Sequence, residues 1–115
     1  MVTTEQQHEA LESAVALFKD IYRETESWPK MQVFGLIMDI RRAAMGLSMN
    51  LTECKNLDWG AESAEFVKIS QENLVELRRH LLLAQKNAAL SADSIEGLLQ
   101  KLSRLEGSIQ KLAAN

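Results

Sequence analysis

The sequence predicts an all-α protein, an antiparallel up-down-up-down four-helix bundle. Three observations predict it. Apolar residues recur at helical spacings in four segments of the chain. No segment alternates apolar and polar residues as a half-buried strand would. Only short breaks, at residues 27–30, 56–60 and 87–90, separate the segments. Because short loops between long helices force consecutive helices to run in opposite directions, the four helices are expected to alternate up and down.

The last segment has the most regular pattern. Its apolar residues are separated alternately by three and four positions: Ile95, Leu98, Leu102, Leu105, Ile109 and Leu112. This is the pattern of a helix packed lengthwise against its neighbours. Ser91 is placed to cap the N-terminus, and Asp93 suits the positive end of the helix dipole. Gly97 and Gly107 each cost about 1 kcal/mol against alanine, which indicates either a close helix approach or simple tolerance.

The second segment carries two adjacent apolar stripes. The first stripe consists of Val33, Ile37, Ile40, Ala44, Leu47, Leu51 and Cys54. The second stripe runs directly beside it and consists of Phe34, Met38, Met45 and Met49. One stripe suffices for a helix whose back is solvated, so two stripes make a wider apolar arc than a small bundle needs. We infer that the second stripe forms an interface between subunits.

The first and third segments have less regular patterns. The first is expected to pack through Leu11, Val15, Phe18, Ile21 and Tyr22. The third is expected to pack through Phe66, Ile69, Leu74, Leu77, Leu81 and Ala84, with Val75 and Leu82 widening its face. Thr3 and Thr4, followed at capping-box spacing by Gln6 and Gln7, predict where the first helix begins. The second and third helices are expected to have about 25 residues each, or about 37 Å at 1.5 Å per residue.

Composition and length predict one globular domain over residues 1–115. Apolar residues make up 46% and charged residues 25% of the chain, which disfavours disorder. No apolar run reaches the roughly 20 residues that cross a bilayer, and the first residues lack a signal pattern. We therefore expect a cytoplasmic protein without a membrane partner. The single cysteine, Cys54, excludes an intrachain disulfide and is interpreted as a small buried hydrophobe.

The sequence predicts no catalytic residue, metal or cofactor. A di-metal carboxylate bundle needs Glu-x-x-His motifs on two helices, whereas this chain has only one, Glu5-Gln6-Gln7-His8 at its N-terminus, and His80 has no glutamate at that spacing. Glu76 and His80 are four residues apart and can form a hydrogen-bonded pair on one helix. The chain has no glycine-rich phosphate loop and no recognisable Ser-His-Asp pattern. No small-molecule substrate is indicated, so the chain is expected to work by association.

Arg41 is aligned with the second apolar stripe of the second helix. A buried guanidinium needs a partner, because an uncompensated buried charge costs about 3–5 kcal/mol. Glu72, Glu76 or a neighbouring subunit could supply that partner, and the alternative is that Arg41 extends to solvent at the bundle edge. A polar network is expected on the same helix, within about 80° of arc at 3.6 residues per turn. Its members are Asp39, Arg42, Asn50 and Glu53, with Glu76 of the third helix assigned to the same network.

Lys101, Arg104 and Lys111 form a basic stripe along one side of the last helix, with Ser108 between them. Three cations are few, because nucleic-acid surfaces make roughly six to ten phosphate contacts. The net charge of −3 gives no general attraction to nucleic acid. The stripe is therefore interpreted as a solvated helix back, or as a nucleic-acid contact if an oligomer repeats it in every subunit.

Several motifs of the second helix resemble one known family. These are Phe34-Gly35-Leu36, Ile40-Arg41-Arg42-Ala43-Ala44 and Asn50-Leu51-Thr52-Glu53. Together with Ile21-Tyr22 and Trp28-Pro29 before them and Leu74-Val75-Glu76-Leu77 and Leu81-Leu82-Leu83-Ala84 after them, they resemble the 23S ribosomal RNA intervening-sequence proteins of bacteria over about residues 11–113.

The resemblance implies a four-helix bundle of poorly defined role that assembles into a homo-oligomer, a pentameric ring. Distant relatives of the family include the accessory variability protein of diversity-generating retroelements, a basic pentamer that binds nucleic acid. This implies the alternative function of a nucleic-acid or ribonucleoprotein adaptor. Family members typically carry a run of Arg and Lys between the second and third helices, whereas residues 57–65 of this chain are acidic.

Overall fold

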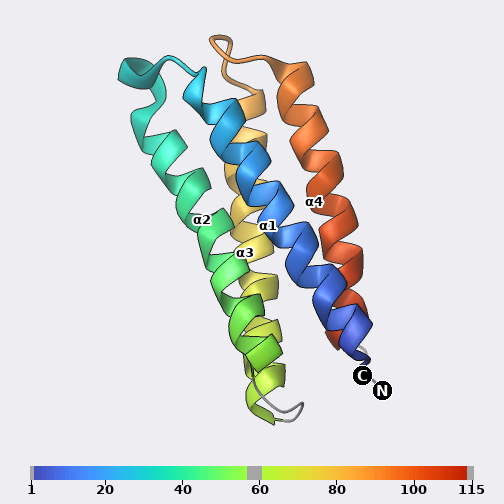
Figure 1. Ribbon diagram of the computed structural model, residues 1–115. Helices are drawn as coiled ribbons and strands as arrows, with labels where there is room; N and C mark the ends of the chain where they lie inside the picture. The colour runs from blue at the N-terminus through green and yellow to red at the C-terminus, as the bar shows by residue number, and fades with distance from the viewer. Residues whose placement is uncertain (1, 57–60, 114–115) are drawn as a thin grey trace.

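The computed structural model describes residues 2–56 and 61–113, and these residues form four α-helices. The helices are α1 (Thr4–Glu26), α2 (Lys30–Asn56), α3 (Ala61–Gln85) and α4 (Ala92–Ala113). Successive helices run in opposite directions, so α1 begins and α4 ends at the same end of the bundle (Figure 1). The predicted all-α, up-down-up-down bundle is confirmed. With 27 and 25 residues, α2 and α3 have about the expected length.

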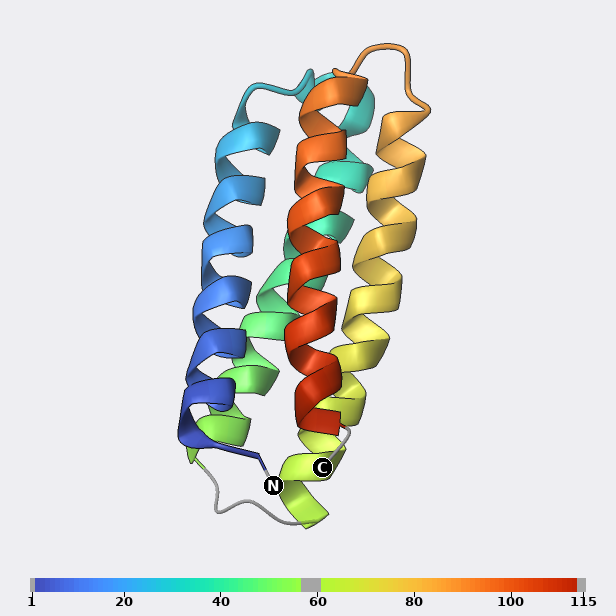
Figure 2. The same ribbon diagram turned by 90° about the vertical axis from the view of Figure 1, so that its right-hand side faces the viewer.

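The four helices stand at the corners of a square. Each helix packs against two others, α2 against α1 and α3, and α4 against α3 and α1. Within residues 2–56 and 61–113 the diagonal pairs make no close backbone contact. Figure 2 shows α4 between α1 and α3, with α2 behind it. Among the described residues, no helix combines the length and hydropathy needed to cross a membrane.

Local sequence signals set the helix ends. The Thr3 hydroxyl accepts a hydrogen bond from the Gln6 backbone N–H at 3.0 Å, and the Gln6 side chain accepts one from the Thr3 N–H at 3.0 Å, which is the predicted capping box. At the start of α4, the Ser91 hydroxyl accepts from the Ser94 N–H at 3.3 Å. Both predicted caps are confirmed, and of the predicted break at residues 56–60, residues 57–60 lie outside the described part of the chain.

Pro29 separates α1 from α2 and shapes the first turn of α2. Its carbonyl accepts hydrogen bonds from the backbone N–H groups of Gln32 and Val33. Val33 departs from helical geometry, with φ −129° and ψ 27°, and this places a kink between the first turn and the rest of α2. Trp28, immediately before the proline, is buried. The break that the sequence predicts at residues 27–30 is therefore a tight, well-packed corner.

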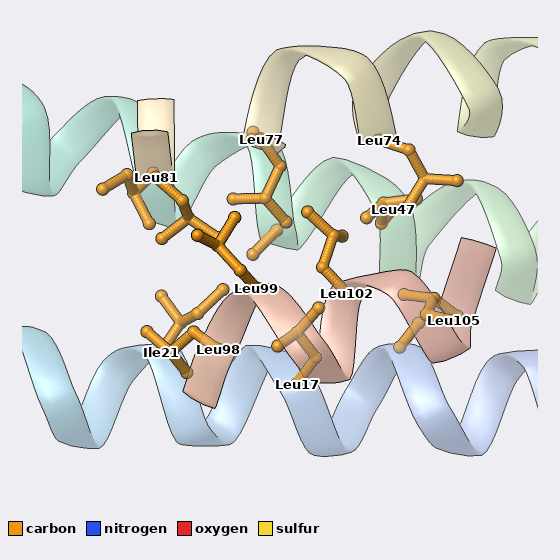
Figure 3. Close-up of a cluster of buried hydrophobic side chains, with 14 of the residues drawn as sticks. Leu17, Ile21, Leu47, Leu74, Leu77, Leu81, Leu98, Leu99, Leu102 and Leu105 are labelled. Atoms are coloured by element: carbon orange, nitrogen blue, oxygen red, sulfur yellow. The ribbon is translucent and has the colours of Figure 1, made fainter. Parts of the chain in front are cut away.

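The core lies along the axis of the bundle and is built mostly from leucine and isoleucine. Every residue of the predicted α4 pattern is buried, and so is every residue of the first stripe of α2. Leu99 of α4, which the pattern did not include, is buried as well. Figure 3 shows how residues of all four helices meet there: Leu17, Ile21, Leu47, Leu74, Leu77, Leu81, Leu98, Leu99, Leu102 and Leu105.

The predicted inward faces of α1 and α3 were partly wrong. In α1 the fully buried residues are Ala10, Ala14, Leu17, Ile21 and Thr25. The other predicted residues of α1 are only half-buried: Leu11, Val15, Phe18 and Tyr22. In α3 the predicted Ile69, Val75 and Leu82 are exposed, and Phe66 is half-buried. Small residues let α1 approach the bundle axis closely, which leaves its larger side chains at the edges between helices.

Candidate functional site

The second apolar stripe of α2 lies outside the core. The exposed fractions are 62% for Phe34, 40% for Met38, 42% for Met45 and 62% for Met49. A helix turns 100° per residue, so these positions fall on one side of α2, next to α1 and away from the buried stripe. Large apolar side chains gathered on one exposed face mark a surface that associates with another apolar surface.

Arg41 lies within this stripe, and α1 supplies its partners. The Arg41 Nε–H donates to the Thr25 hydroxyl at 2.9 Å, and the guanidinium carbon lies 4.2 Å from the centroid of the Tyr22 ring. Thr25 is fully buried and donates its own proton to the Ile21 carbonyl at 2.8 Å. A hydroxyl and an aromatic ring therefore hold Arg41, and the structure pairs Glu76, one of the expected partners, with residues of α3 instead.

The contact between Arg41 and Tyr22 extends the apolar surface from α2 onto α1. Tyr22 packs against Phe18, with ring centroids 4.8 Å apart, and both rings are half-buried. We call the combined surface of Phe34, Met38, Met45, Met49, Tyr22 and Phe18 the methionine face. A cation above an aromatic ring contributes about 0.5–1 kcal/mol at an exposed site and more where water is excluded. The contact with the Tyr22 ring also compensates the charge of Arg41 within the methionine face.

The expected polar network is brought together only in part. Asp39 and Arg42 form an ion pair at 3.6 Å and line a polar groove of about 330 Å³ between α2 and α3. Glu76 lines the same groove from α3, beside Glu72, Asn73 and His80. Asn50 and Glu53 are not among the lining residues, because they lie about three turns further along α2 at 3.6 residues per turn.

Glu76 is the centre of the hydrogen bonds in this groove. Its carboxylate lies 3.1 Å from the His80 Nε2 and accepts from the Arg79 guanidinium at 3.0 Å. The pair of Glu76 and His80 expected from the sequence is thus confirmed. The hydrogen bond to His80, and next the charge of Arg79, hold the pKa of Glu76 below its usual value. Among the described residues, no three His, Cys, Asp or Glu side chains converge as metal ligands.

The basic stripe of α4 faces acidic residues of α1. The Lys101 ammonium lies 2.7 Å from the Asp20 carboxylate, and the Ser108 hydroxyl donates to Glu9 at 3.4 Å. Arg104 lines a groove with Asp20 and Lys101. Lys111 lies about two turns further along α4, at 3.6 residues per turn. Because carboxylates of α1 stand beside this stripe, its field toward a phosphate backbone is weaker than that of isolated cations.

Cys54 ends the buried stripe of α2. Its side chain is 1% exposed, and its sulfur lies 3.5 Å from the Ser63 carbonyl oxygen, to which the thiol donates. Burial raises the pKa of the Cys54 thiol to about 11. A nucleophilic or redox-active cysteine instead needs a stabilised thiolate and access to solvent. The interpretation of Cys54 as a small buried hydrophobe is confirmed.

The structure also shows an apolar groove that the sequence analysis missed. It lies between α3 and α4, has a volume of about 560 Å³, and is lined by Val75, Arg78, Arg79, Leu82, Leu83, Lys86 and Glu106. We call it the α3/α4 groove. Val75 and Leu83 are 69% and 54% exposed. The run Leu81-Leu82-Leu83 covers a wider arc than one buried face can hold, and this was the available signal.

Comparison with known proteins identifies a family. The sequence model described as 23S rRNA-intervening sequence protein matches residues 6–111 of this chain. No curated protein shows significant similarity to it. The matched range begins in the first turns of α1 and ends in the last turns of α4, so it includes the methionine face, the polar groove and the α3/α4 groove.

Proposed function

The chain belongs to the 23S rRNA-intervening sequence protein family, and we propose that it is a non-enzymatic protein that acts by assembling into a homo-oligomer. The observation that carries this proposal is the exposure of the methionine face. Four large apolar side chains of α2 are each at least 40% exposed, although the first stripe of α2 already fills the core. Burying them against another subunit would stabilise the assembly by about 25 cal/mol per Å² of apolar surface removed from water.

The geometry of Arg41 supports the same proposal. Arg41 lies in the middle of an apolar face, and a hydroxyl and an aromatic ring already contact its guanidinium. Another subunit could therefore cover Arg41 without leaving its charge uncompensated. Methionine suits such a surface, since its flexible thioether side chain adapts to an opposing surface. We further propose that the assembly is a cytoplasmic pentamer, the number implied by the resemblance of the Ile40–Ala44 and Asn50–Glu53 motifs to the family.

The test is the molar mass in solution by sedimentation or light scattering. The wild-type protein is expected at five times the chain mass of 12.9 kDa. Met45→Glu and Arg41→Glu are expected to shift the protein toward the monomer, because each places a carboxylate in the contact. Gln100→Glu is the matched control for Met45→Glu, since it adds the same charge at an exposed position of α4. Wild-type protein that stays monomeric at 100 µM would overturn the proposal.

Nucleic-acid binding is the other candidate, and the surface favours it less. Lys101 is engaged by Asp20, and the stripe of Lys101, Arg104 and Lys111 lies beside the acidic α1. An oligomer would repeat both the cations and the neighbouring carboxylates, so repetition adds little net attraction. Salt-sensitive RNA or DNA binding that is lost on replacing the three cations by alanine would favour this candidate instead.

A further inference from the structure

The bundle presents two apolar surfaces on different sides. Because the helices follow one another around a square, the pair α1 and α2 is opposite the pair α3 and α4. The methionine face belongs to the first pair and the α3/α4 groove to the second. In the groove, Val75, Leu82 and Leu83 form an apolar floor. A single molecule therefore has two separate apolar areas on different sides of the bundle.

We propose that the α3/α4 groove is the docking site for the methionine face of a second copy of this chain, so that subunits associate head to tail. This inference rests on the proposed self-assembly and names the second half of its interface. In a head-to-tail contact, each subunit uses two different surfaces, one for each neighbour. Pairing two methionine faces around a twofold axis would instead leave the apolar floor of the α3/α4 groove uncovered.

The half of the methionine face near the start of α2 lies at the same height along the bundle as the α3/α4 groove. Phe34 and Met38 lie about 6 and 12 Å below the start of α2, at 1.5 Å per residue. Leu82 and Val75 lie about 4 and 15 Å below the end of α3 on the same scale. The start of α2 and the end of α3 are at the same end of the bundle (Figure 1). Copies related by rotation about an axis parallel to the bundle would therefore bring Phe34 and Met38 onto the apolar floor.

One pair of opposite charges is placed to meet across this contact. Three cations and one carboxylate line the groove, and Arg78 already binds that carboxylate, Glu106, at 3.3 Å. Lys86 of the groove and Glu26 at the end of α1 are both exposed at the same end of the bundle. Head-to-tail contact would bring these opposite charges near each other.

Two surface variants test the head-to-tail contact. Met38→Glu damages the methionine face, and Leu82→Glu damages the groove. Both side chains are exposed, at 40% and 43%, so each variant is expected to keep the helical circular dichroism of the wild type. Each variant alone is expected to be monomeric, with its dissociation constant raised at least about tenfold for a carboxylate placed in an apolar contact. Mixed in equal amounts, the two are expected to form a one-to-one dimer, because each retains the surface that the other lacks.

The outcomes separate this inference from the proposed function. A monomeric wild type would overturn both. An oligomeric wild type, together with a Leu82→Glu variant of unchanged mass, would overturn the head-to-tail contact and leave self-assembly standing. A mixture of the two variants that stays monomeric would also overturn it, since the two intact surfaces would then have no affinity. Gln100→Glu again serves as the control for added charge.

A charge exchange gives a second, independent measurement. Lys86→Glu and Glu26→Lys are each expected to weaken the assembly by about two- to fivefold, as removal of a rim ion pair does. The double variant is expected to recover most of the wild-type affinity, because it restores the opposite charges in exchanged positions. Equal weakening in the single and double variants would show that Lys86 and Glu26 do not meet across the contact.

Discussion

The position of Arg41 on the apolar face of α2 could be predicted from the sequence, but its contact partners could not. Helical spacing alone places its guanidinium in line with Phe34, Met38 and Met45, and the need for a partner follows from charge. The partners, Thr25 and Tyr22, lie 16 and 19 positions earlier in the chain, and they meet Arg41 only because α1 and α2 are adjacent and antiparallel. The expected carboxylates, Glu72 and Glu76, belong to α3, whereas Arg41 contacts a hydroxyl and a ring of α1.

Cys54 gives a prediction about reactivity. Burial raises the pKa of its thiol from an ordinary 9.0 to about 11, so the thiolate fraction of the folded protein at pH 8 is about 100-fold lower than that of an exposed thiol. Reaction with Ellman's reagent at pH 8 is expected to be at least that much slower in the native protein than in urea. A native thiol that reacts as fast as the denatured one would contradict this.

The raised pKa of the Cys54 thiol also predicts how the stability of the folded protein depends on pH. Because the folded-state pKa is raised, the folded protein holds the thiol proton more tightly than the unfolded chain does. The resulting contribution to stability is complete below pH 9 and is lost as pH rises toward 11. The urea midpoint of the wild type is expected to fall more steeply in this window than that of Cys54→Val, which lacks the titrating group.

At the scale of helices, the predicted faces were right where the buried residues are large and wrong where they are small. In α4 and α2 the inward positions are mostly isoleucine and leucine, and the spacing identified all of them except Leu99 and Ala43. In α1 the inward positions include Ala10, Ala14 and Thr25. A pattern weighted toward large apolar residues therefore selected the edge facing α2, one position round the helix from the true core.

Replacing helical glycines by alanine is expected to change stability differently in α4 and α2. A β-carbon added at Gly97 of α4 would meet no atom within 4 Å, whereas one at Gly46 of α2 would lie 3.1 Å from the Asn73 side-chain nitrogen. Gly97→Ala is expected to raise the free energy of unfolding by about 0.5–1 kcal/mol through helix propensity. Gly46→Ala is expected to gain less, because the Asn73 amide must move. Urea unfolding measures both, and equal gains would contradict the close approach at Gly46.

The space around the helical glycines differs from one position to another. Gly97 and Gly107 indicated either close helix approach or tolerance, and the open space beside both positions favours tolerance. Among the glycines that the structure describes, Gly46, opposite α3, lies in a close approach. Sequence alone could not separate these cases, because all three glycines lie within helical patterns of similar regularity.

At the scale of the whole molecule, the sequence revealed one of the two exposed apolar surfaces. The methionine face was visible because α2 carries a second stripe beside a complete first one. The α3/α4 groove was not, because Val75 and Leu82 look like a broadened core face until the positions of α2 and α4 around α3 are known. Whether an apolar side chain points into the core or away from it depends on where neighbouring helices stand.

Assembly through these surfaces predicts that unfolding depends on protein concentration. If the folded protein is an oligomer and the unfolded chain a monomer, mass action stabilises the folded state as concentration rises. A tenfold increase is expected to add about 1 kcal/mol per subunit, close to RT ln 10. The thermal midpoint of the wild type, measured by circular dichroism from 1 to 100 µM, is therefore expected to rise with concentration. Met38→Glu is expected to show a lower midpoint that does not change with concentration, since its folded and unfolded states are both monomeric. A wild-type midpoint that stays constant over this range would mean that the methionine face remains exposed when the protein is folded.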